Sequence, residues 1–163
     1  MLRTGARALA VRRLQRDTLF DTSDGTLRAQ GCALRVRRDG ERTILTFKGP
    51  AQAGPMKTRE EHETVVLDEG ALLAVLEGLG YRPWFRYEKF REEFTAESIT
   101  IAVDETPVGT YVEVEGDEAG IRSVVSLLGK HEADFVRSSY RQLFTELGGA
   151  HGLSGPDMLF PGK

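Results

Sequence analysis

The sequence has little cysteine and no long apolar run, and both absences narrow the kind of protein it can be. Its single cysteine, Cys32, cannot form an intramolecular disulfide, so we expect a cytoplasmic protein with a buried, unreactive thiol. No stretch approaches the roughly 20 apolar residues that a membrane-spanning helix needs. Residues 1–16 are basic but contain neither an apolar core nor a cleavage site, so we expect no signal peptide and no membrane partner.

The chain also lacks an excess of positive charge. It has 22 Lys and Arg residues against 25 Asp and Glu residues, a formal net charge of −3. General nucleic-acid binding normally needs a basic surplus, so we expect no nucleic-acid partner, although this balance still allows a local basic pocket. The sequence contains no nucleophile elbow, no glycine-rich phosphate loop and no zinc pattern, and its histidines show no ligand spacing.

The patterns that are present predict a single α+β domain. About seven segments alternate as strands, about three have helical spacing, and turn signals separate them at short intervals. Such local connections favour an antiparallel sheet or β-barrel flanked by helices. We expect residues 1–150 to form this domain and residues 151–163 to form a tail that is loosely ordered or docks on the sheet. Residues 1–13 are expected to be the end of a helix, with the first strand over residues 14–22.

Basic side chains recur on one face of the predicted strands. Arg35 and Arg37 share a face, and the turn signal at Asp39-Gly40 predicts a hairpin whose return strand brings Lys48 beside them. Arginine offers phosphate a planar fork of donors and lysine a compact charge. The alternative is that these basic side chains lie on an ordinary solvent-exposed face. For one hairpin alone, the two interpretations are about equally well supported.

Two further predicted strands support the interpretation of this basic face as an anion-binding site. Lys89 and Arg91 are again two residues apart, and Arg59 lies within a predicted acidic strand over residues 57–67. The recurrence of the same spacing on several strands is harder to explain as a solvated surface.

Carboxylates follow the same spacing. Glu61 and Glu63 form one pair, Glu113 and Glu115 form another, and Asp104 ends the strand that precedes the second pair. Clustered carboxylates without histidine or cysteine suit a hard cation, Mg²⁺ or Mn²⁺, especially one shared with phosphate oxygens. The alternative is salt bridging between these acids and the neighbouring Arg and Lys residues, which we expect to hold in part even if the site is real.

The motifs, taken in order, resemble the CYTH domain, the triphosphate tunnel metalloenzyme superfamily. The resemblance covers roughly residues 15–147, and its motifs are weak singly but specific in their joint order. They are Gln15-x-Asp17, Phe20-Asp21-Thr22, Leu34-Arg35-Val36-Arg37, Thr46-Phe47-Lys48, Arg59-x-Glu61-x-Glu63, Lys89-x-Arg91, Asp104, Val112-Glu113-Val114-Glu115-Gly116 and Ser139-Tyr140.

The resemblance implies an eight-stranded antiparallel β tunnel that holds a triphosphate-containing small molecule with Mg²⁺ or Mn²⁺. It implies catalytic roles for Lys89, Arg91 and Glu113. The implied substrate ligands are Arg35, Arg37, Lys48, Arg59, Lys89 and Arg91. The implied metal ligands are Glu61, Glu63, Asp104, Glu113 and Glu115.

One family motif has no counterpart. The family begins with a strand bearing Glu-x-Glu-x-Lys, and residues 1–6 align with the end of the helix that follows it. We therefore expect weaker metal binding and an open tunnel edge that could recruit a second chain as a homodimer.

Three functions fit these features. The first is a metal-dependent triphosphatase acting on inorganic, thiamine or nucleoside triphosphate. The second is a class IV adenylyl cyclase, which would convert ATP to cyclic AMP and pyrophosphate in the same site. The third is a non-catalytic polyphosphate or nucleotide binder. We favour the triphosphatase because that reaction needs only the charged tunnel. No motif in the sequence predicts recognition of adenine.

Overall fold

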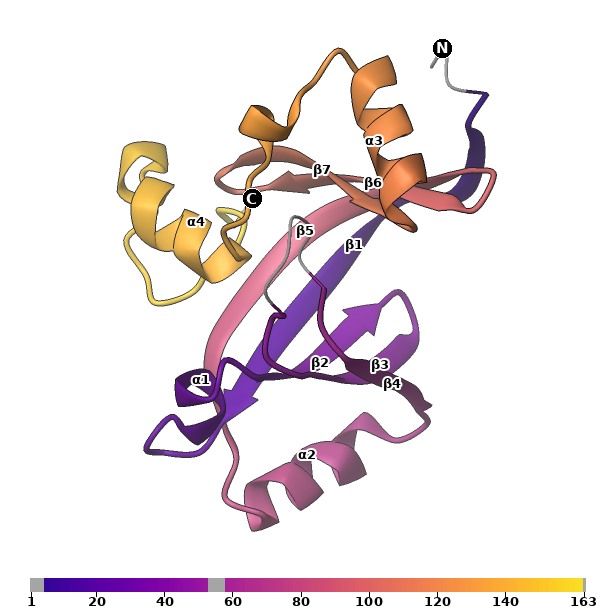
Figure 1. Cartoon of the computed structure of the whole chain (residues 1–163). Coiled ribbons are helices and arrows are strands. Elements are labelled where there is room, and N and C mark those ends of the chain that lie inside the picture. The colour runs from indigo at the N-terminus through magenta and orange to yellow at the C-terminus, as the bar shows by residue number, and fades with distance from the viewer. Residues whose placement is uncertain (1–4, 53–57, 163) are drawn as a thin grey trace.

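Seven antiparallel strands form one sheet in the computed structural model, which describes residues 5–52 and 58–162 (Figure 1). Their order across the sheet is β4-β3-β2-β1-β5-β6-β7. The strands are β1 Arg7–Asp21, β2 Ala33–Asp39, β3 Arg42–Lys48, β4 Glu61–Val66, β5 Arg82–Ala96, β6 Ile99–Thr106 and β7 Gly109–Glu115.

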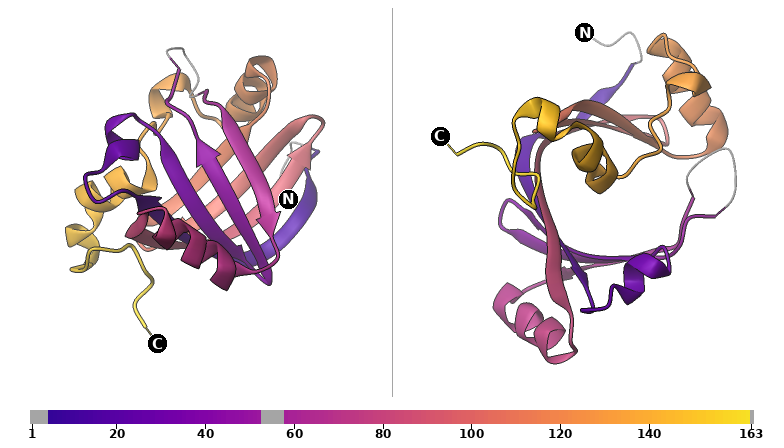
Figure 2. Two further views of the ribbon diagram at one scale, coloured as in Figure 1. Left: turned by 90° about the horizontal axis from the view of Figure 1, so that it is seen from below. Right: turned by 90° about the vertical axis from the view of Figure 1, so that its left-hand side faces the viewer.

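The sheet curls strongly but does not close into a barrel. Seen end-on in Figure 2, right, it forms an open trough, with β4 and β7 as its two edges. Among the described residues no ladder joins β4 to β7. The predicted antiparallel α+β tunnel architecture is therefore confirmed, in an open form.

The described residues also form four α-helices and two 3-10 helices, where three helices were predicted. They are α1 Thr26–Ala29, α2 Glu69–Gly78, α3 Glu118–Leu127 and α4 Tyr140–Leu147, with η1 Glu132–Asp134 and η2 Gly149–His151. Asp68 and Asp117 cap α2 and α3 by accepting hydrogen bonds from the amides of Ala71 and Gly120, each at 2.9 Å.

The outer face of the sheet carries two separate apolar clusters. Under α2, Leu76 packs on Phe20 of β1 and Val36 of β2. Under α3, Val124 packs on Ile99 and Ile101 of β6. These contacts fix which face of each strand points outward, and therefore which alternate residues line the trough.

The inner face is divided between an apolar end and a charged middle. At the apolar end, Phe85 and Tyr87 of β5 pack against Leu143 and Phe144 of α4 and against Met158. The α4 helix therefore covers one end of the trough, and the aromatic rings of β5 are buried beneath it.

The C-terminal tail docks on the sheet, which is one of the two states expected for it. Met158 is fully buried, and its amide and carbonyl bond to Arg86 and Glu88 of β5, each at 2.9 Å. This contact is possible because β6 pairs only with the second half of β5, from Phe90 onward.

Two local predictions were wrong. Residues 7–13 continue β1 and do not end a helix, because this segment pairs with the far end of β5. The strand predicted over residues 57–67 is shorter: β4 begins at Glu61, residues 58–60 are irregular, and residue 57 lies outside the described residues. No described helix has the length and apolar character needed to traverse a membrane.

Candidate triphosphate site

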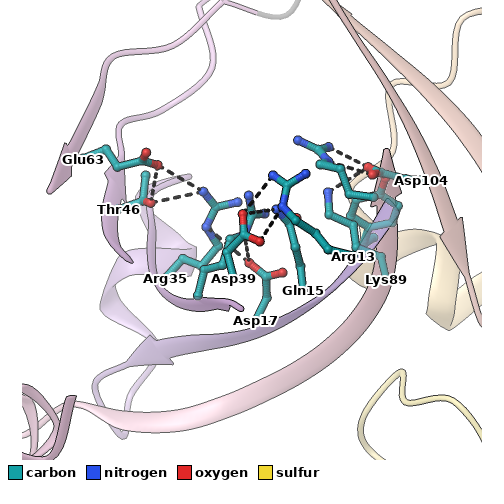
Figure 3. A network of polar contacts seen from close by, with 12 residues as sticks. Arg13, Gln15, Asp17, Arg35, Asp39, Thr46, Glu63, Lys89 and Asp104 are labelled. Carbon is teal, nitrogen blue, oxygen red and sulfur yellow. Dashed lines mark hydrogen bonds and ion pairs between the residues drawn. The ribbon is translucent and has the colours of Figure 1, made fainter. Parts of the chain in front are cut away.

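A row of charged side chains crosses the inner face of the sheet (Figure 3). It is assembled by register: Gln15 of β1 lies between Asp39 of β2 and Lys89 of β5, and Asp17 lies between Arg37 and Tyr87. Since side chains on a strand alternate between its faces, every second residue of adjacent strands reaches the same side. The sheet therefore gathers residues distant in sequence into one band.

Two of the predicted substrate ligands share a buried carboxylate. Asp17, whose side chain is fully buried, accepts a 2.9 Å hydrogen bond from Nε of Arg37 and lies 3.5 Å from Nε of Arg35. Burial disfavours the guanidinium charge, but the adjacent Asp17 carboxylate outweighs it and raises the pKa of Arg37. The Arg37–Asp17 bond uses Nε and not the terminal nitrogens of the fork.

The next strands carry a second mixed group. Arg35 donates to the hydroxyl of Thr46 at 3.1 Å and lies 3.6 Å from Glu63, while Lys48 contacts Glu61 at 2.7 Å. Burial, and to a smaller extent the nearby Arg35 charge, lowers the pKa of Lys48, although Glu61 opposes this change.

On the opposite wall of the trough, two cationic side chains bond to two carboxylates. Asp104 accepts from Nζ of Lys89 at 2.7 Å and from Nε and Nη2 of Arg91 at 2.7 and 2.6 Å. Arg91 also bonds to Glu113. Asp104 is fully buried, whereas 36% of the Glu113 side chain is exposed, so of the two acids Glu113 is the one a ligand can reach.

The charges in this group are held by mutual pairing. Burial disfavours the Asp104 carboxylate, but hydrogen bonds and charge from Arg91 and Lys89 keep its pKa below the ordinary value. Burial lowers the pKa of Lys89 to about 8 even though Glu113 and Asp104 oppose that change. Lys89 is therefore mostly protonated at neutral pH and can donate to an anion.

A tyrosine from outside the sheet completes this wall. The hydroxyl of Tyr140, the first residue of α4, lies 2.6 Å from Oδ2 of Asp104 and 2.9 Å from Oε1 of Glu113. Burial and the two carboxylates raise the pKa of Tyr140, so its hydroxyl stays protonated.

The structure brings together most of the predicted site residues on one face, but at two places along it. Arg35, Arg37, Lys48, Glu61 and Glu63 lie on β2, β3 and β4. The second group lies on β5, β6 and β7 and comprises Lys89, Arg91, Asp104 and Glu113.

Two predicted residues stand apart. Arg59 precedes β4 and is not on a strand, so alternation does not place it. Glu115 ends β7, opposite Thr100, and is exposed.

Sequence reasoning gave no role to one group of the band. Arg13 contacts Asp39 at 2.6 Å and Glu93 at 2.5 Å, and the amide of Gln15 donates to Asp39 at 2.8 Å. Glu93 continues the alternation of Lys89 and Arg91, a signal that could have found it. Arg13 could not be found, because residues 7–13 were expected to be helical.

Asp104 and Glu113 are two predicted metal ligands that share Arg91 and Tyr140 as partners. Within the described part of the chain, no three acidic, histidine or cysteine side chains form a complete ligand cluster. Magnesium is commonly held by one or two carboxylates together with substrate phosphates. Asp104 is fully buried and both of its oxygens are bonded, so of this pair only the partly exposed Glu113 could meet such a cation. All five predicted metal ligands, Glu61, Glu63, Asp104, Glu113 and Glu115, stay predictions.

Comparisons with known proteins agree with this geometry. A model of the CYTH domain matches residues 2–140. A protein of Methanocaldococcus jannaschii, named as a candidate adenylate cyclase, is 26% identical over 143 residues, which cover 81% of this chain and 82% of that protein.

Solved structures share the fold. One, a candidate adenylate cyclase of Vibrio parahaemolyticus, superposes with a TM-score of 0.74 at 20% identity, covering 86% of this chain and 84% of that one. Another, the Hippeastrum adenylyl cyclase candidate HpAC1, is described as having a dominant triphosphatase activity. It superposes with a TM-score of 0.61 at 16% identity, covering 89% and 85% of the two chains.

Proposed function

Because the chain belongs to the CYTH domain family, we propose that it hydrolyses the terminal phosphate of a triphosphate in the trough, with Mg²⁺ or Mn²⁺. The observation that carries this proposal is the band of buried cations on the inner face. Arg35, Arg37, Lys89 and Arg91 are each at most 8% exposed, yet their side chains line a concave surface and not a packed core. Burying four cations this deeply is costly unless anions compensate them.

The basic residues of β2 and β3 would hold the phosphates. Arg37 is anchored through its hydrogen bond to Asp17 and Arg35 through its hydrogen bond to Thr46, so both side chains are positioned before the ligand arrives. A guanidinium fork matches two phosphate oxygens, and Lys48 adds a compact charge at the rim. Preorganised donors of this kind cost little reorganisation when negative charge develops during the reaction.

The opposite wall would carry the chemistry. Lys89 and Arg91 would stabilise the charge that develops on the transferred phosphoryl group and on the leaving oxygen. Glu113, partly exposed, would orient the attacking water. A divalent cation bound with the phosphates beside Glu113 would act as a Lewis acid on the phosphoryl oxygens.

We expect inorganic triphosphate to be used at least as well as a nucleoside triphosphate. The aromatic residues Phe85, Tyr87 and Tyr111 pack in or against the cluster beneath α4, so they offer no open face on which a base could stack. The middle of the trough presents mainly charged and hydroxyl groups.

A second function, class IV adenylyl cyclase, is favoured by the name of the Methanocaldococcus relative. In that reaction the ribose 3′-hydroxyl of ATP would attack the α-phosphorus and release pyrophosphate. The neighbour from Hippeastrum supports hydrolysis, since a dominant triphosphatase activity is described for that cyclase candidate.

Phosphorus NMR separates these functions in a single sample. The protein is incubated with ATP and inorganic triphosphate together, first with Mg²⁺ and then with Mn²⁺. Orthophosphate indicates a triphosphatase, and the substrate resonances that shrink identify its substrate. Pyrophosphate with cyclic AMP indicates a cyclase. If neither product forms although triphosphate binds, the chain is a binder and the proposal is wrong.

Two neighbouring arginines provide a matched pair of variants. Arg37 points into the trough, whereas Arg38, the next residue of β2, points outward to Glu69 at 2.9 Å and is 60% exposed. We expect Arg37→Ala to abolish phosphate release and Arg38→Ala to leave it nearly unchanged. Equal effects of the two substitutions would show that the face assignment is wrong.

A further inference from the structure

A cavity of about 460 Å³ lies on the outer face of the sheet, behind the charged trough. Its floor includes Phe20 of β1 and Val36 of β2, which belong to the apolar cluster under α2. One wall is α2 itself, which lies outside the curve of the sheet in Figure 2, right, and another includes Leu159 of the docked tail. Small-molecule sites typically measure roughly 300–1,000 Å³ and combine a mainly apolar lining with a few polar groups, so this cavity has a suitable size for a ligand. None of the predicted substrate or metal ligands is among the residues that line it.

Two leucines on separate elements border the cavity without being buried. Leu73 of α2 is 36% exposed and Leu159 is 39% exposed, whereas Phe20 and Val36 on the floor are each only 4% exposed. An apolar group placed against the two leucines would remove their surface from water, which is favourable in proportion to the area covered. The cavity therefore suits the apolar body of a ligand.

A polar pair of side chains lies beside this apolar surface. Thr18 of β1 is paired with Arg86 of β5 on one side and with Val36 of β2 on the other. Directly paired residues of antiparallel strands point to the same face of the sheet, so the Thr18 and Arg86 side chains both border the cavity. A guanidinium fork and a hydroxyl can together donate hydrogen bonds to one carboxylate.

Arg86 is the most loosely paired of the four arginines that line the cavity. Arg16 and Arg38 are held by glutamates at 3.0 and 2.9 Å, and Arg82 donates to two backbone carbonyls at 2.7 and 2.9 Å. The Arg86 guanidinium instead lies 3.5 Å from Asp157, whose other oxygen accepts from the Arg86 backbone amide at 2.7 Å. Charge-assisted hydrogen bonds are normally about 2.7–2.9 Å long, so Arg86 can turn to a ligand without breaking a short ion pair.

We propose that the cavity binds a small organic acid as its monoanion. The carboxylate is held by Arg86 and Thr18, and the apolar body lies over Phe20 and Val36. One loosely paired arginine compensates one negative charge, whereas a triphosphate carries several and would face the glutamates of the cavity wall. Binding of an organic acid here does not depend on the reaction proposed for the trough.

Calorimetry with octanoate tests the proposal, with octan-1-ol as the probe that keeps the chain and lacks the charge. Arg86→Ala removes the guanidinium but leaves the tail in place, since Met158 bonds to the backbone of Arg86. Arg122→Ala is the matched control, because Arg122 lies on α3, is about half exposed and is paired with Glu118 at 2.9 Å.

We expect the octanoate Kd to be about tenfold weaker for Arg86→Ala, because a hydrogen bond to a charged group is lost, and within about twofold of wild type for Arg122→Ala. Octan-1-ol should bind wild type at least about tenfold more weakly than octanoate does, for the same reason. Absence of octanoate binding by wild type, or equal Kd values for Arg86→Ala and wild type, would overturn the inference.

Two further variants locate the bound octanoate. Leu73→Trp changes no charge but fills the cavity from α2, so we expect it to weaken octanoate binding at least about tenfold. Arg37→Ala alters only the trough, so the octanoate Kd should stay within about twofold of wild type. Loss of octanoate affinity in Arg37→Ala but not in Leu73→Trp would place the anion in the trough and refute the cavity as its site.

Discussion

Replacing Asp17 by Asn tests whether the trough depends on one buried charge. Asp17 is fully buried and compensates two guanidinium groups, Arg37 at 2.9 Å and Arg35 at 3.5 Å. Asparagine keeps the shape and one acceptor but removes the charge, which leaves two buried cations undercompensated. Removing one partner of a buried ion pair typically costs about 3–5 kcal/mol, and the retained acceptor favours the lower end, about 3 kcal/mol. For a domain of this size we therefore expect Tm to fall by roughly 6–12 °C.

Thermal unfolding followed by circular dichroism measures this directly. The control is Glu118→Gln, which removes a carboxylate from an exposed pair with Arg122 at 2.9 Å, where both side chains are about half exposed. Water and salt screen such a pair, so we expect a far smaller change in Tm. If the two substitutions lower Tm equally, or if Asp17→Asn leaves it unchanged, the Asp17 charge does not hold the arginines.

Two further predictions concern Lys89 and the tail. Burial lowers the pKa of Lys89 from 10.5 to about 8. Between these two pH values the unfolded chain therefore binds more protons at this site than the folded chain does. The free energy of unfolding of wild type relative to Lys89→Met should therefore rise from pH 8 to 10.5 in urea titrations, and a fall would contradict the pKa shift. Met158→Ala, at a fully buried position, should cost about 3 kcal/mol, whereas Leu159→Ala, 39% exposed, should cost clearly less in the same assay; equal losses would mean that the tail is not part of the core.

The strands could be predicted from the sequence where the residues on their two faces differ for a clear structural reason. Around Arg35 and Arg37, apolar and charged residues alternate because Leu34 and Val36 pack in the cluster under α2 and the arginines line the trough. On β5 charged residues lie on both faces, and the two-residue spacing of Lys89 and Arg91 indicated only that these two share a face, which is the inner one. The turn at Asp39-Gly40 was equally clear, since Gly40 adopts a φ of 63°.

Other features could not be predicted because they depend on partners distant in sequence. Residues 7–13 become a strand through pairing with β5, and Arg13 enters the band only as a result. Tyr140 was noted within a motif, but its contact with Asp104 depends on how α4 packs across the trough. The pairing of Asp17 with two arginines likewise follows from the register of β1 against β2, which no local pattern specifies.

The order of the strands has a consequence for how the chain folds. β1 to β4 are neighbours joined by local connections, and so are β5 to β7, whereas only the β1–β5 ladder joins the two halves. Closing that ladder pairs residues that are 61 (Asp21 and Arg82) to 88 (Arg7 and Thr95) positions apart in the chain. The entropy lost on closing such long loops opposes folding until the contacts between the strands have formed. We therefore expect the two halves to form early and the ladder to limit the folding rate. Since Gln15 meets Lys89 across this ladder, the two halves of the charged band are joined only in that final step.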